Sequence, residues 1–314
     1  MKDKLLEIIK KFDSIVVFGH INPDGDCYGS QTALKKIINQ NFSEKNVYIV
    51  GSGIKRFFCL LGNMDEVTDE IIKDSLAIIV DCSAYDRLED TRVSLAKAVI
   101  IFDHHIPNED LIDAPSLIDT EKIATCEIIT EWAIKNNLAF DQLAAEALFL
   151  GICTDSGRFV YKQTTGNTLR LASVLIDKDF DIEQFYEILY LTYEKDLRLQ
   201  GFILSRYKKT KSGFIYVTFT QKDLKNLHLE GSNVASKVNT LANIEGYKVW
   251  GVFTEYPDGI YRVELRSRGI SIQPVTLMYG GGGHANACGI ARLAPEKIKS
   301  VIDSVDKYLL EKQK

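Results

Sequence analysis

Three ionisable residues stand together directly after an apolar segment: Asp103-His104-His105 follow residues 98–102. The segment is short, rich in β-branched residues and without helical periodicity, which predicts a buried parallel strand. Open α/β sheets bind ligands at the carboxyl ends of their strands. The sequence therefore places one carboxylate and two imidazoles, all potential ligands of a metal ion, at such an edge.

Three further apolar runs end in ionisable residues, and we expect all four to end at one edge of the sheet. Residues 15–19 lead into His20, Asp24 and Asp26, residues 76–80 into Asp81, and residues 147–152 into Asp155. Residues 141–152 also fit a helix pattern. An isolated aspartate at a strand end is usually a helix cap or a turn residue. Four ends that deliver the same ligand types argue against that explanation for the whole set.

The combined set is rich enough to hold two metal ions. It comprises His20, Asp24, Asp26, Asp81, Asp103, His104, His105 and Asp155. Clustered carboxylates repel one another unless cations are present. Carboxylate and imidazole ligands without thiolate suit Mn²⁺, Mg²⁺ or Fe²⁺. Two such ions, roughly 3.5–4 Å apart and sharing a carboxylate, activate water and stabilise in-line displacement at phosphorus.

A second candidate site lies near the C-terminus. Four consecutive glycines, residues 280–283, precede His284, and Arg262, Arg266 and Arg268 share strand parity before them. Glycine lets a backbone approach an anion closely, and arginine binds phosphate through two N–H groups. The pattern therefore predicts a phosphate-binding surface, with a flexible loop beside a solvated basic strand as the alternative.

Length and composition limit the fold and the partners. The 314 residues suit two domains, and the formal charge of −5 argues against a long basic track for duplex nucleic acid. No apolar run is long enough to span a membrane, and the amphipathic start lacks a signal-peptide pattern, so we expect a cytoplasmic protein without a membrane partner.

Strand and helix patterns alternate over residues 1–180, which predicts an α/β fold with a mostly parallel, doubly wound sheet. We expect this α/β domain at 1–190, a linker helix at 191–211 and a smaller α+β domain at 212–314.

These motifs, in this order, resemble the DHH phosphoesterase superfamily in its DHH–DHHA1 arrangement. The motifs are His20 to Asp26, Val80-Asp81, Asp103-His104-His105, Thr154 to Phe159, and the tetraglycine run with His284. The length is similar to that of the bifunctional oligoribonuclease and pAp phosphatase (nano-RNase A) group. RecJ exonucleases are larger, and family II pyrophosphatases have a different C-terminal domain.

The resemblance implies a role for each matching residue. His20, Asp24 and Asp81 would hold one metal ion, and Asp26, Asp81, His104 and Asp155 the other, with Mn²⁺ as the expected metal. Asp81, Asp103 and His105 form the expected catalytic set, in which Asp81 bridges the ions, Asp103 orients a neighbouring ligand and His105 faces the phosphate. The expected substrate-binding residues are His105, Arg158, Arg262, Arg266, Arg268, Gly281, Gly282, Gly283 and His284.

The implied activity is hydrolysis of very short RNA to mononucleotides and of the 3′-phosphate of pAp to give AMP. One alternative is a phosphodiesterase for linear or cyclic dinucleotides such as pApA or c-di-AMP. Another is a nucleotide sensor without turnover, which the filled ligand positions disfavour. A homodimer through the first domain is expected at the family level only.

Overall fold

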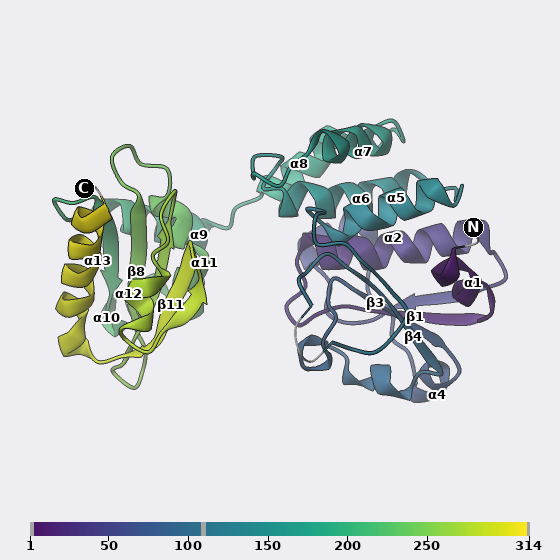
Figure 1. Ribbon diagram of the computed structural model, residues 1–314, viewed down its shortest axis with the longest axis horizontal. Coiled ribbons are helices and arrows are strands. Elements are labelled where there is room, and N and C mark those ends of the chain that lie inside the picture. The colour runs from purple at the N-terminus through teal and green to yellow at the C-terminus, as the bar shows by residue number, and fades with distance from the viewer. Residues whose placement is uncertain (1–2, 108–110, 313–314) are drawn as a thin grey trace. The chain divides into compact units, whose positions relative to one another are not determined.

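A computed structural model describes residues 3–107 and 111–312 of the chain (Figure 1). The chain divides into two compact units, Met1–Tyr190 and Leu191–Lys314, here called the N-terminal unit and the C-terminal unit. Across the described residues, no helix combines the length and apolar character needed to cross a bilayer. Each unit has its own sheet with a hydrophobic core on each face.

The N-terminal unit is built on a five-stranded parallel sheet with strand order β2-β1-β3-β4-β5. The strands are β1 (Ser14–Phe18), β2 (Asn46–Ile49), β3 (Leu76–Val80), β4 (Ala98–Asp103) and β5 (Ser116–Ile118). Strands β1, β3 and β4 are neighbours, so the loops that follow them meet at one edge. The predicted parallel sheet is confirmed, with the short strand β5 at its edge.

Helices cover both faces of this sheet, as a doubly wound fold requires (Figure 1). Alternate residues of β1 serve different cores: Ile15 and Val17 pack in one, and Val16 and Phe18 in the other. The first core is shared with α1 (Lys4–Lys10), α2 (Gly25–Asn41), α5 (Thr125–Lys135), α6 (Gln142–Asp155) and α7 (Gly166–Ile176). It also takes in α3 (Phe58–Leu61) and α8 (Ile182–Tyr190), whereas α4 (Asp69–Lys73) contributes to the second.

The fourth expected strand end is wrong, because residues 147–152 belong to helix α6. Every residue from Ala144 to Cys153 is buried, so the helix is apolar on all sides and lacks an amphipathic pattern. Such a segment cannot be distinguished from a buried strand by periodicity. Asp155 is the last residue of this helix, so three strand ends and one helix end supply the expected ligands.

The C-terminal unit contains a six-stranded mixed sheet with strand order β10-β11-β9-β8-β7-β6, in which β7 and β8 are parallel. The strands are β6 (Lys208–Lys209), β7 (Phe214–Phe219), β8 (Val249–Glu255), β9 (Tyr261–Ser267), β10 (Gly282–His284) and β11 (Ala287–Leu293). Helices α12 (Gln273–Leu277) and α13 (Ile298–Lys312) pack with the core of one face. Helices α10 (Gln221–Leu227) and α11 (Gly231–Ser236) pack with the other. The expected smaller α+β fold is confirmed.

The stretch 191–211, expected to be a linker helix, is an integral part of the C-terminal unit. Helix α9 (Glu194–Arg206) ends before β6 and buries Leu199 and Ile203 completely in the core beneath β7 and β8. Its charged residues Glu194, Lys195, Arg198 and Arg206 are exposed. A helix with such an apolar stripe gains stability by packing rather than by standing free in solvent.

Candidate metal and substrate sites

The loop after β1 is shaped so that its acids point toward the strand ends. Asp24 caps helix α2, and its Oδ1 accepts hydrogen bonds from the N–H groups of Asp26 and Cys27 at 3.0 and 3.1 Å. Asn22 and Asp81 both have left-handed backbones, with φ of 57° and 58°. Asparagine and aspartate tolerate this region better than most residues, and strained conformations of this kind cluster at functional sites.

Asp26 is completely buried, yet its carboxylate is held by backbone donors from a distant part of the chain. Its Oδ2 and Oδ1 accept hydrogen bonds from the N–H groups of Thr125 and Cys126, at 2.6 and 2.8 Å, in the first turn of α5. The Thr125 hydroxyl also donates to Asp81 Oδ1 at 3.0 Å. Helix N-termini stabilise anions in this way. No spacing in the sequence linked Thr125 to the ligand motifs, so this contact was not foreseen.

Asp81 lies at the centre of the cluster and turns one oxygen toward each histidine. Its Oδ2 is 3.4 Å from His20 Nε2, and its Oδ1 is 3.4 Å from His104 Nε2. His20 Nε2 is also 3.8 Å from Asp24 Oδ1. On the other side, His104 Nε2 is 3.5 Å from Asp155 Oδ2 and 3.8 Å from Asp26 Oδ2.

These contacts form sets of side chains that could each hold a metal ion. Ligand atoms lie within 4.8 Å of one another in three sets: His20, Asp24 and Asp81; Asp26, His104 and Asp155; Asp81, His104 and His105. The first set coincides with one of the two ligand groups expected from the resemblance. The second set contains three of the four ligands expected in the other group. The fourth, Asp81, belongs to the third set, which shares His104 with the second.

Both central histidines are oriented by their second ring nitrogen. His20 Nδ1 lies 3.0 Å from the carbonyl oxygen of Ile21, and His104 Nδ1 lies 3.3 Å from that of Lys122. A carbonyl can only accept, so Nδ1 carries a proton, and Nε2 is the ring nitrogen left to bind a metal ion among the carboxylates. This arrangement is typical of metal-ligating histidines.

The cluster's unsatisfied atoms and raised pKa values fit a cation site. Among the described residues, Asp81 Oδ2 and His104 Nε2 are buried without a hydrogen-bond partner. Burial, together with the charge of Asp26, raises the pKa of Asp81 well above its ordinary value. Burial and the charges of Asp26 and Asp24 raise the pKa of Asp155 to about 9. Divalent cations would remove this repulsion, so the residues present suit metal ions.

Asp103 and His105 form a pair beside the cluster. The buried Asp103 Oδ1 accepts hydrogen bonds from the N–H of His105 at 3.1 Å and from its Nδ1 at 2.9 Å. Burial would raise the pKa of Asp103, but the hydrogen bonds from His105 and Ser83 outweigh it and lower the pKa. About half of the His105 side chain is exposed, at 48%, so Asp103 orients an imidazole that faces solvent.

Arg158 follows the last ligand closely in an unusual turn. Gly157, Arg158 and Phe159 are all left-handed, with φ of 57°, 62° and 66°, immediately beyond the end of α6. The Arg158 guanidinium lies 5.6 Å from the ring centre of Tyr190. The structure thus places this expected substrate-binding residue three positions beyond Asp155, with its side chain against an aromatic ring.

In the C-terminal unit, two of the expected phosphate-binding residues share one row of the sheet. Ala287 of β11 pairs with Arg266 of β9 on one side and with His284 of β10 on the other. Neighbouring strands are roughly 4.8 Å apart, so about 10 Å separates the Arg266 and His284 backbones. Residues paired across neighbouring strands point to the same face, so Arg266 and His284 flank the small Ala287 on one face of the sheet.

The glycine run serves strand packing more than direct anion binding. The N–H groups of Gly280 and Gly281 donate to the carbonyl oxygens of Leu277 and Thr276, so neither is free for a phosphate. A Cβ on Gly281 would collide with the carbonyl oxygen of Gly289, and Gly283 has a φ of +117°. The run also lets β10 lie close to β11, and Gly282 faces open space. The expected binding of an anion by Gly281, Gly282 and Gly283 stays a prediction.

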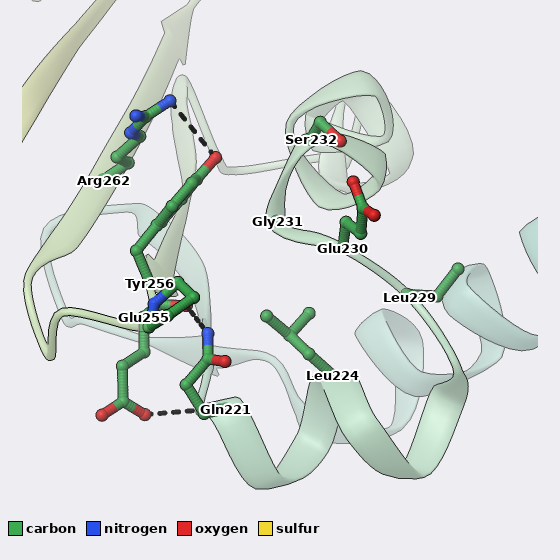
Figure 2. A pocket seen from close by; sticks show the side chains of 10 residues that line it. Gln221, Leu224, Leu229, Glu230, Gly231, Ser232, Glu255, Tyr256 and Arg262 are labelled. Atoms are coloured by element: carbon green, nitrogen blue, oxygen red, sulfur yellow. Dashed lines mark hydrogen bonds between the residues drawn. The ribbon is translucent and has the colours of Figure 1, made fainter.

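The other two arginines are separated from the Arg266–His284 row. Arg262 stacks on Tyr256, with its guanidinium 4.0 Å from the ring centre, and lines a pocket of about 480 Å³ with Leu224 and Glu230 (Figure 2). Arg268 lies beyond the end of β9 and donates to Asn243 Oδ1. The expectation that Arg262, Arg266 and Arg268 line one strand face therefore holds for the first two only.

Glu264, which the sequence reasoning passed over, lies between Arg262 and Arg266 on that face. Its Oε2 is buried and has no hydrogen-bond partner among the described residues. Burial raises the pKa of Glu264, and the two arginines oppose that rise.

Two protein-family models match the chain. The model described as "DHH family, N-terminal domain" matches residues 14–152, and the model "DHHA1 domain" matches residues 212–311. The first includes every expected metal ligand except Asp155, and the second includes the Arg266–His284 row.

Curated relatives match over nearly the whole length. The bifunctional oligoribonuclease and PAP phosphatase NrnA of Mycoplasma genitalium is 35% identical over 97% of this chain and 96% of its own. The protein of that name from Bacillus subtilis is 33% identical over 92% of both chains. An exopolyphosphatase-related protein from Bacteroides fragilis superimposes with a TM-score of 0.82 over 98% of this chain and 94% of its own. That match is 22% identical and shows the fold alone.

Proposed function

Because the chain belongs to the DHH family and carries a DHHA1 domain, we propose that it is a metal-dependent phosphoesterase that hydrolyses very short RNA to mononucleotides and pAp to AMP. The relatives named as oligoribonuclease and PAP phosphatase, at 33–35% identity over most of the chain, support this substrate class. The formal charge of −5 agrees with a short substrate, which needs few phosphate contacts.

The placement of Asp81 between two histidine-centred ligand sets carries the proposal. Its two oxygens are each 3.4 Å from a different imidazole Nε2, which is what a carboxylate shared by two ions requires. Two divalent cations, Mn²⁺ in our proposal, would supply Lewis acidity and lower the pKa of a water molecule toward neutrality.

The chain's own residues position these ions and the substrate. Thr125 and the start of α5 fix Asp26 and Asp81, and the Ile21 and Lys122 carbonyl oxygens fix His20 and His104. Asp103 keeps the His105 imidazole directed outward, where it can donate to a phosphoryl oxygen or hand a proton to the leaving group.

The Arg266–His284 row of the C-terminal unit would bind another anionic group of the substrate. Arginine binds phosphate through two parallel N–H groups, and an imidazole adds one donor. Arg158, whose guanidinium lies against Tyr190, would contribute to substrate binding next to Asp155.

The deciding experiment measures Mn²⁺-dependent hydrolysis of pAp, an RNA dinucleotide, a 24-nucleotide RNA and c-di-AMP side by side. Turnover of pAp and the dinucleotide, with slow cleavage of the long RNA, is the expected result. A preference for c-di-AMP or pApA would instead assign the protein to dinucleotide turnover. Binding without hydrolysis of any substrate would contradict the proposal and favour a nucleotide sensor.

A further inference from the structure

A small cavity opens beside the metal-ligand cluster of the N-terminal unit. It measures about 50 Å³, and its lining comprises Asp81, Cys82, Ser83, Ala84, Arg87, Asp103, His105 and Ile106. This volume has room for a few water-sized atoms and is far too small for a nucleobase. The cavity can therefore admit a water molecule or a single oxygen of a phosphoryl group, and its lining combines the carboxylates of Asp81 and Asp103 with the cationic Arg87.

Arg87 brings the cavity's only guanidinium, and its backbone is attached to the loop of the first metal ligand. Its carbonyl oxygen accepts a hydrogen bond from the N–H of Ile21 at 2.8 Å, and Leu88 forms a β-bridge with His20. The N–H of Glu89 donates to the carbonyl oxygen of Gly19 at 3.1 Å. The short helical turn Tyr85–Arg87 is thus fixed relative to His20 from both sides.

The Arg87 side chain is exposed and uncommitted. No hydrogen bond or ion pair joins its guanidinium to any residue in the described part of the chain. Arg92, five residues further along, differs in every respect: it pairs with Asp90 and Asp69 and donates to the carbonyl oxygen of Val67. An arginine without a partner among the described residues, beside a dense group of carboxylates, is available to bind an anionic ligand.

The charge of the cluster explains why a cation is needed there. The carboxylates gathered at this edge are Asp24, Asp26, Asp81, Asp103 and Asp155. Their combined negative charge exceeds the positive charge that two divalent ions would bring, and a phosphate substrate adds more. A guanidinium at the rim would offset this excess and donate two N–H groups in the plane of a phosphoryl group.

We propose that Arg87, which lines the cavity together with His105, binds non-bridging oxygens of the phosphoryl group under attack. This inference rests on the proposed function, since it assigns a further residue to the same reaction. Arg87 thus becomes a second substrate-binding arginine of the N-terminal unit beside Arg158. The other arginines expected from the sequence lie in the C-terminal unit. It would act on the group that reacts and so affect both binding and turnover.

The test compares Arg87→Ala and Arg87→Lys with Arg92→Ala as the matched control. We expect Arg87→Ala to lower kcat/KM for the RNA dinucleotide about 10- to 100-fold, the value of one or two hydrogen bonds to a charged group. Arg87→Lys, which keeps the charge but loses the planar fork, should fall between it and the wild type. Calorimetry on the Mn²⁺-loaded proteins would measure binding of inorganic phosphate, and a separate titration the Mn²⁺ affinity.

We expect Arg87→Ala to bind phosphate more weakly than the wild type while its Mn²⁺ affinity stays unchanged. Arg92→Ala should bind both phosphate and Mn²⁺ as the wild type does. Phosphate binding equal to the wild type would overturn the assignment. So would an equal loss of Mn²⁺ affinity, because Arg87 would then only support the His20 loop. If the wild type hydrolyses none of the substrates, the proposed function fails, and the phosphate titration still decides the role of Arg87.

Discussion

The metal-ligand cluster and the Arg266–His284 row differ in what holds their side chains. In the cluster, Asp26 and Asp81 are almost fully buried, and backbone N–H groups and a threonine hydroxyl fix their oxygens. In the row, the Arg266 guanidinium donates to the carbonyl oxygen of the neighbouring Leu265, and His284 is exposed. The first region is preorganised by the fold, and the second consists of long side chains that can adapt to a ligand.

This difference indicates that the N-terminal unit performs the chemistry and the C-terminal unit binds the substrate. Chemistry at phosphorus depends on ligand positions within a fraction of an ångström, which buried and hydrogen-bonded side chains provide. Binding several related short substrates tolerates movement, which the half-buried Arg266 and the exposed His284 allow. Substitutions in the cluster should therefore affect turnover, and substitutions in the row should affect substrate affinity.

The largest effect is expected from Asp81→Asn. Loss of a ligand shared by both ions should lower kcat by about a thousandfold, more than the 10- to 100-fold typical of outer-shell changes. Asparagine tolerates the left-handed backbone at this position, so the fold should persist. In chelator, the variant should even unfold at a higher temperature than the wild type, because a repelled carboxylate has been removed. The control is Asp86→Asn, an exposed position in the next turn; unchanged kcat in Asp81→Asn would disprove the bridging role.

Metal removal should affect one unit only, and the two tryptophans can report each unit separately. Trp132 is buried in the N-terminal unit and Trp250 in the C-terminal unit, so Trp250→Phe and Trp132→Phe each leave a single reporter. Mn²⁺ at a hundredfold excess over its Kd stabilises the bound unit by about 2.7 kcal/mol. The fluorescence midpoint of Trp132 should thus rise by roughly 5–10 °C on adding Mn²⁺ to chelated protein, while that of Trp250 stays constant. Equal shifts of both reporters would contradict a metal site confined to the N-terminal unit.

Arg266→Ala should have a smaller effect than Asp81→Asn, and the effect should be on KM rather than on kcat. We expect KM for the dinucleotide to rise about tenfold, with kcat nearly unchanged, since a charge-assisted hydrogen bond contributes about 1.5 kcal/mol. The Mn²⁺-induced rise in the Trp132 midpoint should be the same as in the wild type. Arg292→Ala, which removes an exposed arginine paired with Asp258, is the matched control. A fall in kcat with constant KM would show that the row takes part in the chemical step.

The sequence predicted the metal-ligand cluster more completely than the second site, for a physical reason. Parallel strands deliver their carboxyl ends to one edge, so Asp81 and Asp103 could be placed together from the apolar runs before them. The same logic mistook residues 147–152 for a strand, because a helix buried on all sides has no periodicity. Asp155 still reached the cluster, since a helix end served as well as a strand end.

The second site depended on information that no local pattern contains. Strand parity correctly put Arg262 and Arg266 on one face, but the end of β9 at Ser267 excluded Arg268. The pairing of Arg266 with Ala287 and His284 follows from the register of three strands. The glycines offered two interpretations, and close packing of β10 against β11 was neither of them.

The smallest effect is expected at Glu146, a buried carboxylate of α6 outside every candidate metal-ligand set of the described residues. Burial, with a contribution from the charge of Asp181, raises its pKa to about 7. The folded N-terminal unit therefore binds more protons than the unfolded chain between pH 4.5 and about 7, and its stability should fall as the pH rises through this window. Glu146→Gln should raise the Trp132 midpoint by a few degrees at pH 8.5, corresponding to about 1 kcal/mol, and change it little at pH 4.5.

Glu183→Gln, at an exposed position of α8, should show no such pH dependence. In the metal-ligand cluster, a bound cation can relieve the repulsion between buried acids, whereas at Glu146 only a proton can. An equal effect of Glu146→Gln at both pH values would mean that this carboxylate is stabilised by a contact other than its proton.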